Sequence, residues 1–206
     1  MKNSFTTNGF TIVEVLVAVV IFSLAIGLVF NIYVLAQKFY QRGETEAELL
    51  QNGRITLERI SRDIRQATEM VTALPQTPDS LLSPPPSAIE FQDGHQPSPY
   101  ALLGSDYYYI RYYLATSTGP GEMHRQYRVY CFDSCGVCSS YYRWNDTRIQ
   151  GEETVVAHAC NLEDYAVGEY FSDIKFWGTS LVNISIELTR FNYPVNLKSA
   201  VSGRNL

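Results

Sequence analysis

The chain has 206 residues, a formal net charge of −5 and 15 tyrosines. This length allows one or two domains, and the aromatic content is typical of strands and interfaces rather than of a disordered tail. The acidic balance, without a block of like charges, argues against a non-specific phosphate-binding surface. We therefore expect no nucleic-acid partner; a head that binds DNA through a local patch is the alternative.

A long apolar run lies close to the N-terminus. No charged residue occurs between Val15 and Ala36, and the first one beyond is Lys38. In a helix this run roughly matches the ~30 Å hydrocarbon core of a bilayer. An ordinary secretory signal has a shorter apolar region and a small-residue cleavage site at its far end. The run therefore predicts a single membrane-spanning helix rather than a secretory signal.

The residues that precede this run are unlike a folded segment. Met1 to Gly9 read as a removable leader, in which Lys2 supplies the positive charge of a cytoplasmic flank. Glu14 follows at the edge of the apolar run, where an ionised group is costly unless it has a partner or a function.

The junction resembles that of the type IV pilin family, because Gly9, Phe10, Thr11 and Glu14 match the family's motif position by position. The resemblance implies that a prepilin peptidase cuts after Gly9, removing a 1–9 leader, and N-methylates Phe10. It also implies that residues 10–36 form the transmembrane and assembly half of a long helix. In the family, the carboxylate corresponding to Glu14 pairs with the N-terminal amine of a neighbour, here Phe10. The alternative is a glutamate that reaches the lipid headgroups.

Beyond the apolar run the pattern becomes amphipathic. Two interleaved series of apolar or small residues recur every seven positions and give one stripe at helical spacing. This pattern predicts a continuous helix over about 11–73, whose amphipathic half covers 37–74, packs on its own head domain and ends before Pro75. The series are Leu50, Leu57, Ile64 and Val71, and Gly53, Ile60, Ala67 and Leu74.

An arginine-rich stretch in the amphipathic half points to a smaller group within the type IV pilin family. The segment is similar to minor pilins of the W type and to minor type II secretion pseudopilins of the J type. The ending Val201 to Asn205 also resembles a terminal motif of that group, with Gly203 in place of a leucine. The likeness is carried by Arg54, Leu57, Glu58, Arg59, Ser61, Arg62, Asp63, Arg65, Gln66 and Ala67.

The remainder of the chain has the pattern of short strands. Residues 75–87 are a proline-rich loop, and residues 88–206 form a β-rich head. A helix followed by an antiparallel meander predicts an α+β fold, in which the long N-terminal helix packs on an antiparallel sheet. The expected strands are Ala88–Gln92, Asp106–Ala115, Tyr127–Phe132, Tyr141–Trp144, Asp173–Phe176 and Val182–Thr189.

A tyrosine cluster lies in the second of these strands. Tyr107, Tyr108, Tyr109, Tyr112 and Tyr113 invite a ligand-binding interpretation. Alternate rings lining both faces of a strand explain the cluster better. An exposed aromatic patch for a neighbouring subunit is the functional alternative.

The four cysteines are Cys131, Cys135, Cys138 and Cys160. A pilin-type head is exported to an oxidising compartment, so we expect disulfides. Three connectivities are open, and we favour Cys138–Cys160 with Cys131–Cys135. A zinc site with four thiolates and a redox-active Cys135-x-x-Cys138 are the alternatives.

No catalytic constellation stands out. The histidines His95, His124 and His158 are scattered, and neither a nucleophile elbow nor a P-loop is present. We therefore expect no enzymatic activity, no cofactor and no metal. The resemblance implies a minor pilin or pseudopilin with its head outside the cytoplasmic membrane. Its partners would be other pilin or pseudopilin subunits, prepilin peptidase, the inner-membrane assembly platform and the membrane. The alternative is a membrane-anchored enzyme or metal-binding module.

Overall fold

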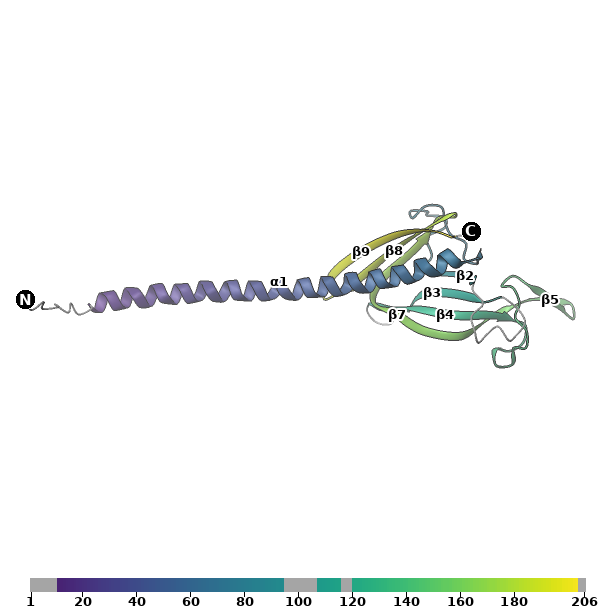
Figure 1. Cartoon of the computed structure of the whole chain (residues 1–206), viewed down its shortest axis with the longest axis horizontal. Helices are drawn as coiled ribbons and strands as arrows, with labels where there is room; N and C mark the ends of the chain where they lie inside the picture. The colour runs from purple at the N-terminus through teal and green to yellow at the C-terminus, as the bar shows by residue number, and fades with distance from the viewer. Residues whose placement is uncertain (1–10, 95–106, 116–119, 204–206) are drawn as a thin grey trace, which may run out of the picture. The chain divides into compact units, whose positions relative to one another are not determined.

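A computed structural model describes residues 11–94, 107–115 and 120–203 (Figure 1). The chain divides into two compact units, one ending at Thr45 and the other beginning at Glu46. A single helix, α1 (Ile12–Gln66), supplies the first unit and the start of the second. The second unit adds an antiparallel sheet of seven strands. The α+β fold with a long N-terminal helix is therefore confirmed.

In the first unit the apolar side chains of α1 are exposed. Every residue from Thr11 to Glu44 is exposed, and an 18-residue window of α1 reaches a mean hydropathy of 2.9. This helix is long and apolar enough to cross a membrane. Two polar side chains inside the run bond to carbonyls of their own helix: Ser23 Oγ donates to Val19 O, and Asn31 Nδ2 donates to Gly27 O, each at 2.8 Å. Such bonds satisfy polar groups that lipid cannot.

In the second unit α1 buries one stripe against the sheet. Leu49, Ile60 and Ile64 are fully buried in the main core together with apolar side chains of the sheet. Gly53 allows a close approach, because a Cβ at this position would lie 2.5 Å from Leu197 Cδ1. The amphipathic pattern thus places the helix on the sheet through apolar burial.

The helix ends earlier than the sequence predicts. It stops at Gln66, not near residue 73, because the chain then enters β1 (Glu69–Met70), which pairs with β2 (Ala88–Gln92). Val71 N donates to Glu90 O at 2.9 Å, which extends this pairing. The seven-residue period continues through Val71 and Leu74, but a strand partner distant in sequence decides their conformation. No helix or strand covers residues 75–87.

The seven strands form one meander-like sheet in the order β1-β2-β3-β4-β7-β8-β9, with every pairing antiparallel. In Figure 1 the sheet lies along the C-terminal part of α1, with β8 and β9 to one side and β3 and β4 to the other. A separate hairpin pairs β5 with β6. The remaining bounds are β3 (Tyr109–Ala115), β4 (Gly121–Cys131), β5 (Thr147–Gln150), β6 (Glu153–Val156), β7 (His158–Trp177), β8 (Leu181–Arg190) and β9 (Tyr193–Ser202).

Several strand predictions need correction. The segment Asp173–Phe176 is only the end of the 20-residue β7, whose pairing with β4 and β8 shifts register and so hides the alternation. Tyr127–Phe132 is likewise the end of a longer β4. Tyr141–Trp144 is not a regular strand and forms one isolated bridge, Tyr130 with Tyr142. Strands β5, β6 and β9 lacked a clear signal.

The alternation in β8 and the tyrosines in and next to β3 agree with the predictions. Val182, Ile184, Ile186 and Leu188 are all fully buried. Tyr108 and Tyr112 belong to the main core, whereas Tyr109 packs edge-on against Tyr130 in a second cluster, with ring centroids 4.9 Å apart. The cluster therefore lines two faces and contributes chiefly to packing.

Candidate functional site

Glu14 begins α1 in a reciprocal capping arrangement with Thr11. The Glu14 backbone N–H donates to Thr11 Oγ1 at 3.3 Å, and the Thr11 N–H donates to Glu14 Oε2 at 3.4 Å. This is the capping box of the form T-x-x-E, and it places a negative charge at the favourable end of the helix dipole. Glu14 therefore has partners within its own chain. The sequence reasoning missed this role, although the spacing Thr11-x-x-Glu14 signals it.

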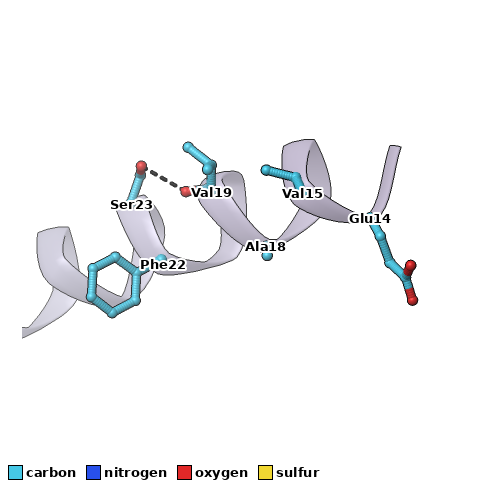
Figure 2. Close-up of a pocket in the computed structure, with 6 residues that line it drawn as sticks. All are labelled: Glu14, Val15, Ala18, Val19, Phe22 and Ser23. Carbon is cyan, nitrogen blue, oxygen red and sulfur yellow. Dashed lines mark hydrogen bonds between the residues drawn. The ribbon is translucent and has the colours of Figure 1, made fainter. Parts of the chain in front are cut away.

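The side chains that follow Glu14 form an apolar surface on the same helix. Figure 2 shows Glu14 at one end of this surface, with Ala18 and Phe22 following along the helix. Because residues four apart share a helix face, the methyl of Ala18 leaves a hollow between two larger groups. Small residues at such positions let a neighbouring helix approach closely within a membrane.

The other two residues of the predicted junction lie outside the described residues. Gly9 and Phe10, where cleavage and methylation are expected, precede Thr11, the first described residue. The pairing of Glu14 with the Phe10 amine of another subunit therefore stays a prediction.

Comparison with known proteins gives one match. A family model described as the prokaryotic N-terminal methylation motif matches residues 6–30, which include Gly9, Phe10 and Glu14. The match supports the type IV pilin-like family. That family is structural rather than enzymatic, and its members act with pilin-type partners and a prepilin peptidase. No curated protein and no solved structure matches the chain.

The apolar helix and the motif are together consistent with membrane anchoring. A helix that is apolar on all sides within its own chain requires an apolar surrounding. The motif occupies the start of that helix, which is where a pilin-like protein carries its processing site.

Two disulfides close the end of the head near β4 and β7. They join Cys131 to Cys138 and Cys135 to Cys160, with Cα atoms 6.1 and 5.4 Å apart. The pairing predicted from sequence is therefore wrong. Cys135 starts a short 3₁₀ helix (Cys135–Val137) that brings it to Cys160, and the chain then returns Cys138 to the end of β4. The two disulfide-closed loops therefore overlap in the sequence, and the spacing of the cysteines alone does not reveal this pairing.

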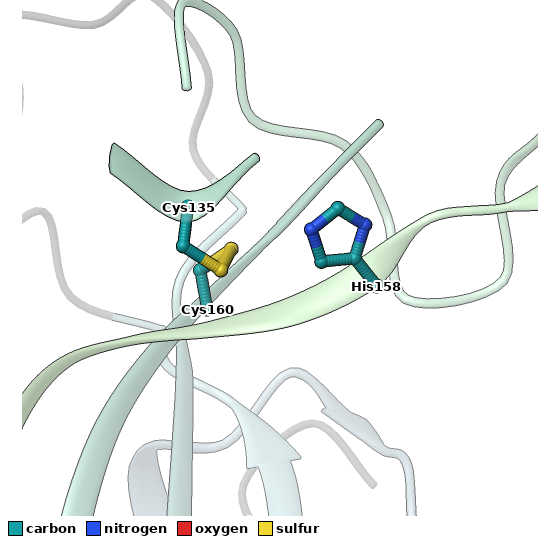
Figure 3. Close-up of side chains that lie close together, drawn as sticks. All are labelled: Cys135, His158 and Cys160. Atoms are coloured by element: carbon teal, nitrogen blue, oxygen red, sulfur yellow. A yellow bond between two sulfur atoms is a disulfide. The ribbon is translucent and has the colours of Figure 1, made fainter. Parts of the chain in front are cut away.

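His158 lies beside the second disulfide. A ring nitrogen of His158 and the sulfurs of Cys135 and Cys160 are all within 4.8 Å of one another (Figure 3). Zinc binds thiolates, and a sulfur in a disulfide is not a thiolate. The disulfide-bonded head therefore does not offer the four-thiolate site considered above. Cys135 and Cys138 belong to different bridges, so they do not form a redox pair with each other.

A half-buried polar cluster ties the arginine-rich part of α1 to the sheet. Asp63 Oδ2 accepts from Arg125 Nε at 2.9 Å and from the Tyr112 hydroxyl at 2.7 Å. Burial, reinforced by Asp63, raises the pKa of Tyr112, so its hydroxyl remains a donor. Burial lowers the pKa of Arg125, but the charge of Asp63 outweighs it and the net shift is upward. Arg59 Nη2 donates to the Tyr165 hydroxyl at 2.7 Å, and this bond links α1 to β7.

A histidine joins two carboxylates on β4 and β7. His124 Nδ1 lies 2.8 Å from Asp164 Oδ1, and His124 Nε2 lies 3.3 Å from Glu122 Oε2. Burial lowers the pKa of His124, but the bonds to the two carboxylates outweigh it and raise the pKa overall. Tyr113 and Gln126 also donate to Asp164, which therefore connects β3, β4 and β7.

Proposed function

We propose that this chain is a minor pilin or pseudopilin, a structural and assembly-priming subunit of a type IV pilus or a type II secretion pseudopilus. The observation that carries the proposal is the methylation motif at the start of an exposed apolar helix, with Glu14 in the first helical turn. The sheet head gives the subunit a folded part, joined to that helix without a break in α1.

The chemistry of Glu14 provides the assembly step. Removal of residues 1–9 would create an amine on Phe10, one residue before the Thr11 cap. Within a helix bundle that excludes water, a carboxylate is tolerated only when it is paired. Glu14 would then exchange the weak contacts of its capping box for the amine of a neighbouring subunit. This ion pair would fix the axial register between two helices.

The minor role rests on the arginine-rich part of α1. Leu57 and Asp63 are among the residues that carry the resemblance to W-type and J-type subunits. Leu57 is buried in the main core, and Asp63 accepts a hydrogen bond from Arg125. Arg62 and Arg65 of the same stretch are exposed. The segment thus combines head packing with an outward basic surface, which suits a specialised subunit.

The expected location is the cytoplasmic membrane, with the head on its outer side. Two disulfides in the head support this proposal, since such bonds persist in oxidising compartments. Prepilin peptidase and the inner-membrane assembly platform would then act on the N-terminal end.

Mass spectrometry of the mature N-terminus tests the proposal. The full chain should be expressed with and without a prepilin peptidase. We expect an N-methylated Phe10 only when the peptidase is present, and an uncut chain for Gly9→Ala under the same conditions. An intact Met1 in both strains would overturn the proposal and favour a membrane-anchored enzyme or binding module.

A further inference from the structure

Three potential metal ligands meet at the end of the head that carries the disulfides. His158 and Cys160 are two positions apart on β7, and alternate residues of a strand project from the same face. Cys135 reaches them from the short 3₁₀ helix that it begins. The pairings of His158 with Cys131 and of Cys160 with Val129 hold this part of β7 against β4. The three side chains therefore gather on a strand that its neighbour keeps in place.

The His158 ring is available as a metal ligand. It is exposed, and one ring nitrogen turns toward the bridge, within 4.8 Å of both sulfurs (Figure 3). Within residues 11–94, 107–115 and 120–203, no group forms a hydrogen bond or ion pair with this ring. By contrast, both ring nitrogens of His124 are bonded to carboxylates. An imidazole with a free nitrogen binds a metal without first giving up another partner.

The bridge between Cys135 and Cys160 is open to attack from the side of Cys135. Cys135 is exposed, whereas Cys160 is only 2% exposed. A thiolate of a dithiol reductant attacks Cys135 Sγ, the bond between the two sulfurs breaks, and Cys160 leaves as a thiolate. The second thiol of the reductant then attacks the mixed disulfide and releases Cys135. The reductant loses two electrons and becomes a disulfide, and the bridge becomes two thiols.

We propose that the reduced Cys135 and Cys160 form a zinc site with His158, and that the bridge excludes this site. Zinc bonds of about 2.3 Å to sulfur and about 2.0 Å to nitrogen place tetrahedral ligand atoms roughly 3.5–3.8 Å apart. The three ligand atoms lie within 4.8 Å of one another, so rotation of the exposed Cys135 side chain brings them to this spacing. Two thiolates balance the charge of Zn²⁺, and binding releases the two thiol protons to solvent.

This site differs from the four-thiolate site considered above and does not depend on the proposed assembly role. Cys131 and Cys138 keep their own bridge and contribute no ligand. Among the described residues, no further histidine, cysteine or carboxylate joins the group. Three protein ligands leave the fourth position of zinc to water or a small anion, as in open zinc sites. Exchange with an oxidised dithiol re-forms the bridge and releases the metal, so zinc binding follows the redox state of the head.

Zinc titration of the full chain in detergent tests the proposal. The oxidised chain is compared with the chain reduced by tris(2-carboxyethyl)phosphine under nitrogen, because a dithiol would itself chelate zinc. Bound Zn²⁺ is measured by competition with a chromophoric chelator. We expect no zinc on the oxidised chain and one zinc on the reduced chain, with two sulfur ligands and one protein nitrogen ligand in its X-ray absorption spectrum. C131S/C138S should keep this zinc, and C135S/C160S should lower the affinity at least tenfold.

His158→Gln and His124→Gln, each in the C131S/C138S chain, form a matched pair. The first should weaken zinc binding at least tenfold, and the second should leave it unchanged, because His124 lies in a separate cluster. No zinc on the reduced chain, equal zinc on the oxidised chain, loss of zinc in C131S/C138S, or unchanged affinity in His158→Gln would overturn the inference. Circular dichroism reports the folding of each reduced chain. A chain that retains all three ligands but unfolds on reduction should refold with Zn²⁺, and failure to do so also overturns the inference.

Discussion

The two halves of α1 have the same backbone conformation and opposite surroundings. In the first unit Ile12 and Phe22 are 81% and 68% exposed, whereas Ile60 and Ile64 in the second unit are fully buried. The first half is apolar on all sides, and the second has one apolar stripe. The difference shows that the second half packs its apolar stripe on the sheet of its own chain. The first half is exposed along its whole length, which is consistent with anchoring in a membrane.

Glu14→Ala should give the largest effect and should act on the first half alone. Membrane insertion and cleavage after Gly9 should persist, while incorporation into a filament should fall at least tenfold. The physical reason is that the substitution would leave the Phe10 amine unpaired in the proposed helix bundle. The measurement is the amount of subunit in sheared filaments relative to the membrane. Normal incorporation would show that the two halves do not differ in this way.

Asp63→Ala should act on the second half alone. It leaves Arg125 without its carboxylate at a position where both side chains are only 14% exposed. Removing one partner of such a pair costs about 3 kcal/mol of unfolding free energy. Denaturant unfolding of the full chain in detergent measures this loss. Glu58→Ala is the matched control, because its pair with Arg62 is exposed and should contribute less than about 1 kcal/mol. Equal losses would contradict the role given to the cluster.

Removing each disulfide in turn should lower the stability of the head by an amount that depends on the length of the loop it closes. Cys135–Cys160 closes 25 residues and Cys131–Cys138 closes 7. The chain-entropy relation gives about 3.5 and about 2.4 kcal/mol respectively. We therefore expect C135S/C160S to lower the unfolding free energy by about 1 kcal/mol more than C131S/C138S. The reverse order would show that local packing, not loop closure, decides the contribution of each bridge.

The smallest expected effect is the pH dependence due to His124. Its pKa is raised in the folded head, so its contribution to stability is complete below the unfolded pKa of about 6.5. The contribution is lost as pH rises through the folded pKa. Because the cluster is partly accessible to solvent, the change should be under about 1 kcal/mol. His124→Gln should remove this slope in melting temperature, whereas His158→Gln should retain it. A slope unchanged in His124→Gln would refute the assignment.

Local patterns identified the features that depend on nearby residues. The run after Glu14 indicated a membrane-length helix, and the alternation from Val182 to Leu188 indicated a half-buried strand, because both periods are written in consecutive side chains. The sequence pattern places the end of α1 too late, because Val71 continues the helical period. Its backbone nevertheless bonds to Glu90, a residue 19 positions away. The spacing Thr11-x-x-Glu14 indicates the capping role of Glu14, whereas the processing motif predicts a pairing between subunits.

The sequence by itself determined the apolar helix, the processing motif and the α+β class, since each follows from residue types at fixed local spacing. Only the tertiary structure decided which cysteines pair, how far β7 extends and which arginines turn outward. Those outcomes depend on contacts between distant segments, such as Cys135 with Cys160 and Asp63 with Arg125. Chain spacing does not encode which of several possible distant partners a side chain meets, because that choice is made by the packing of the whole head.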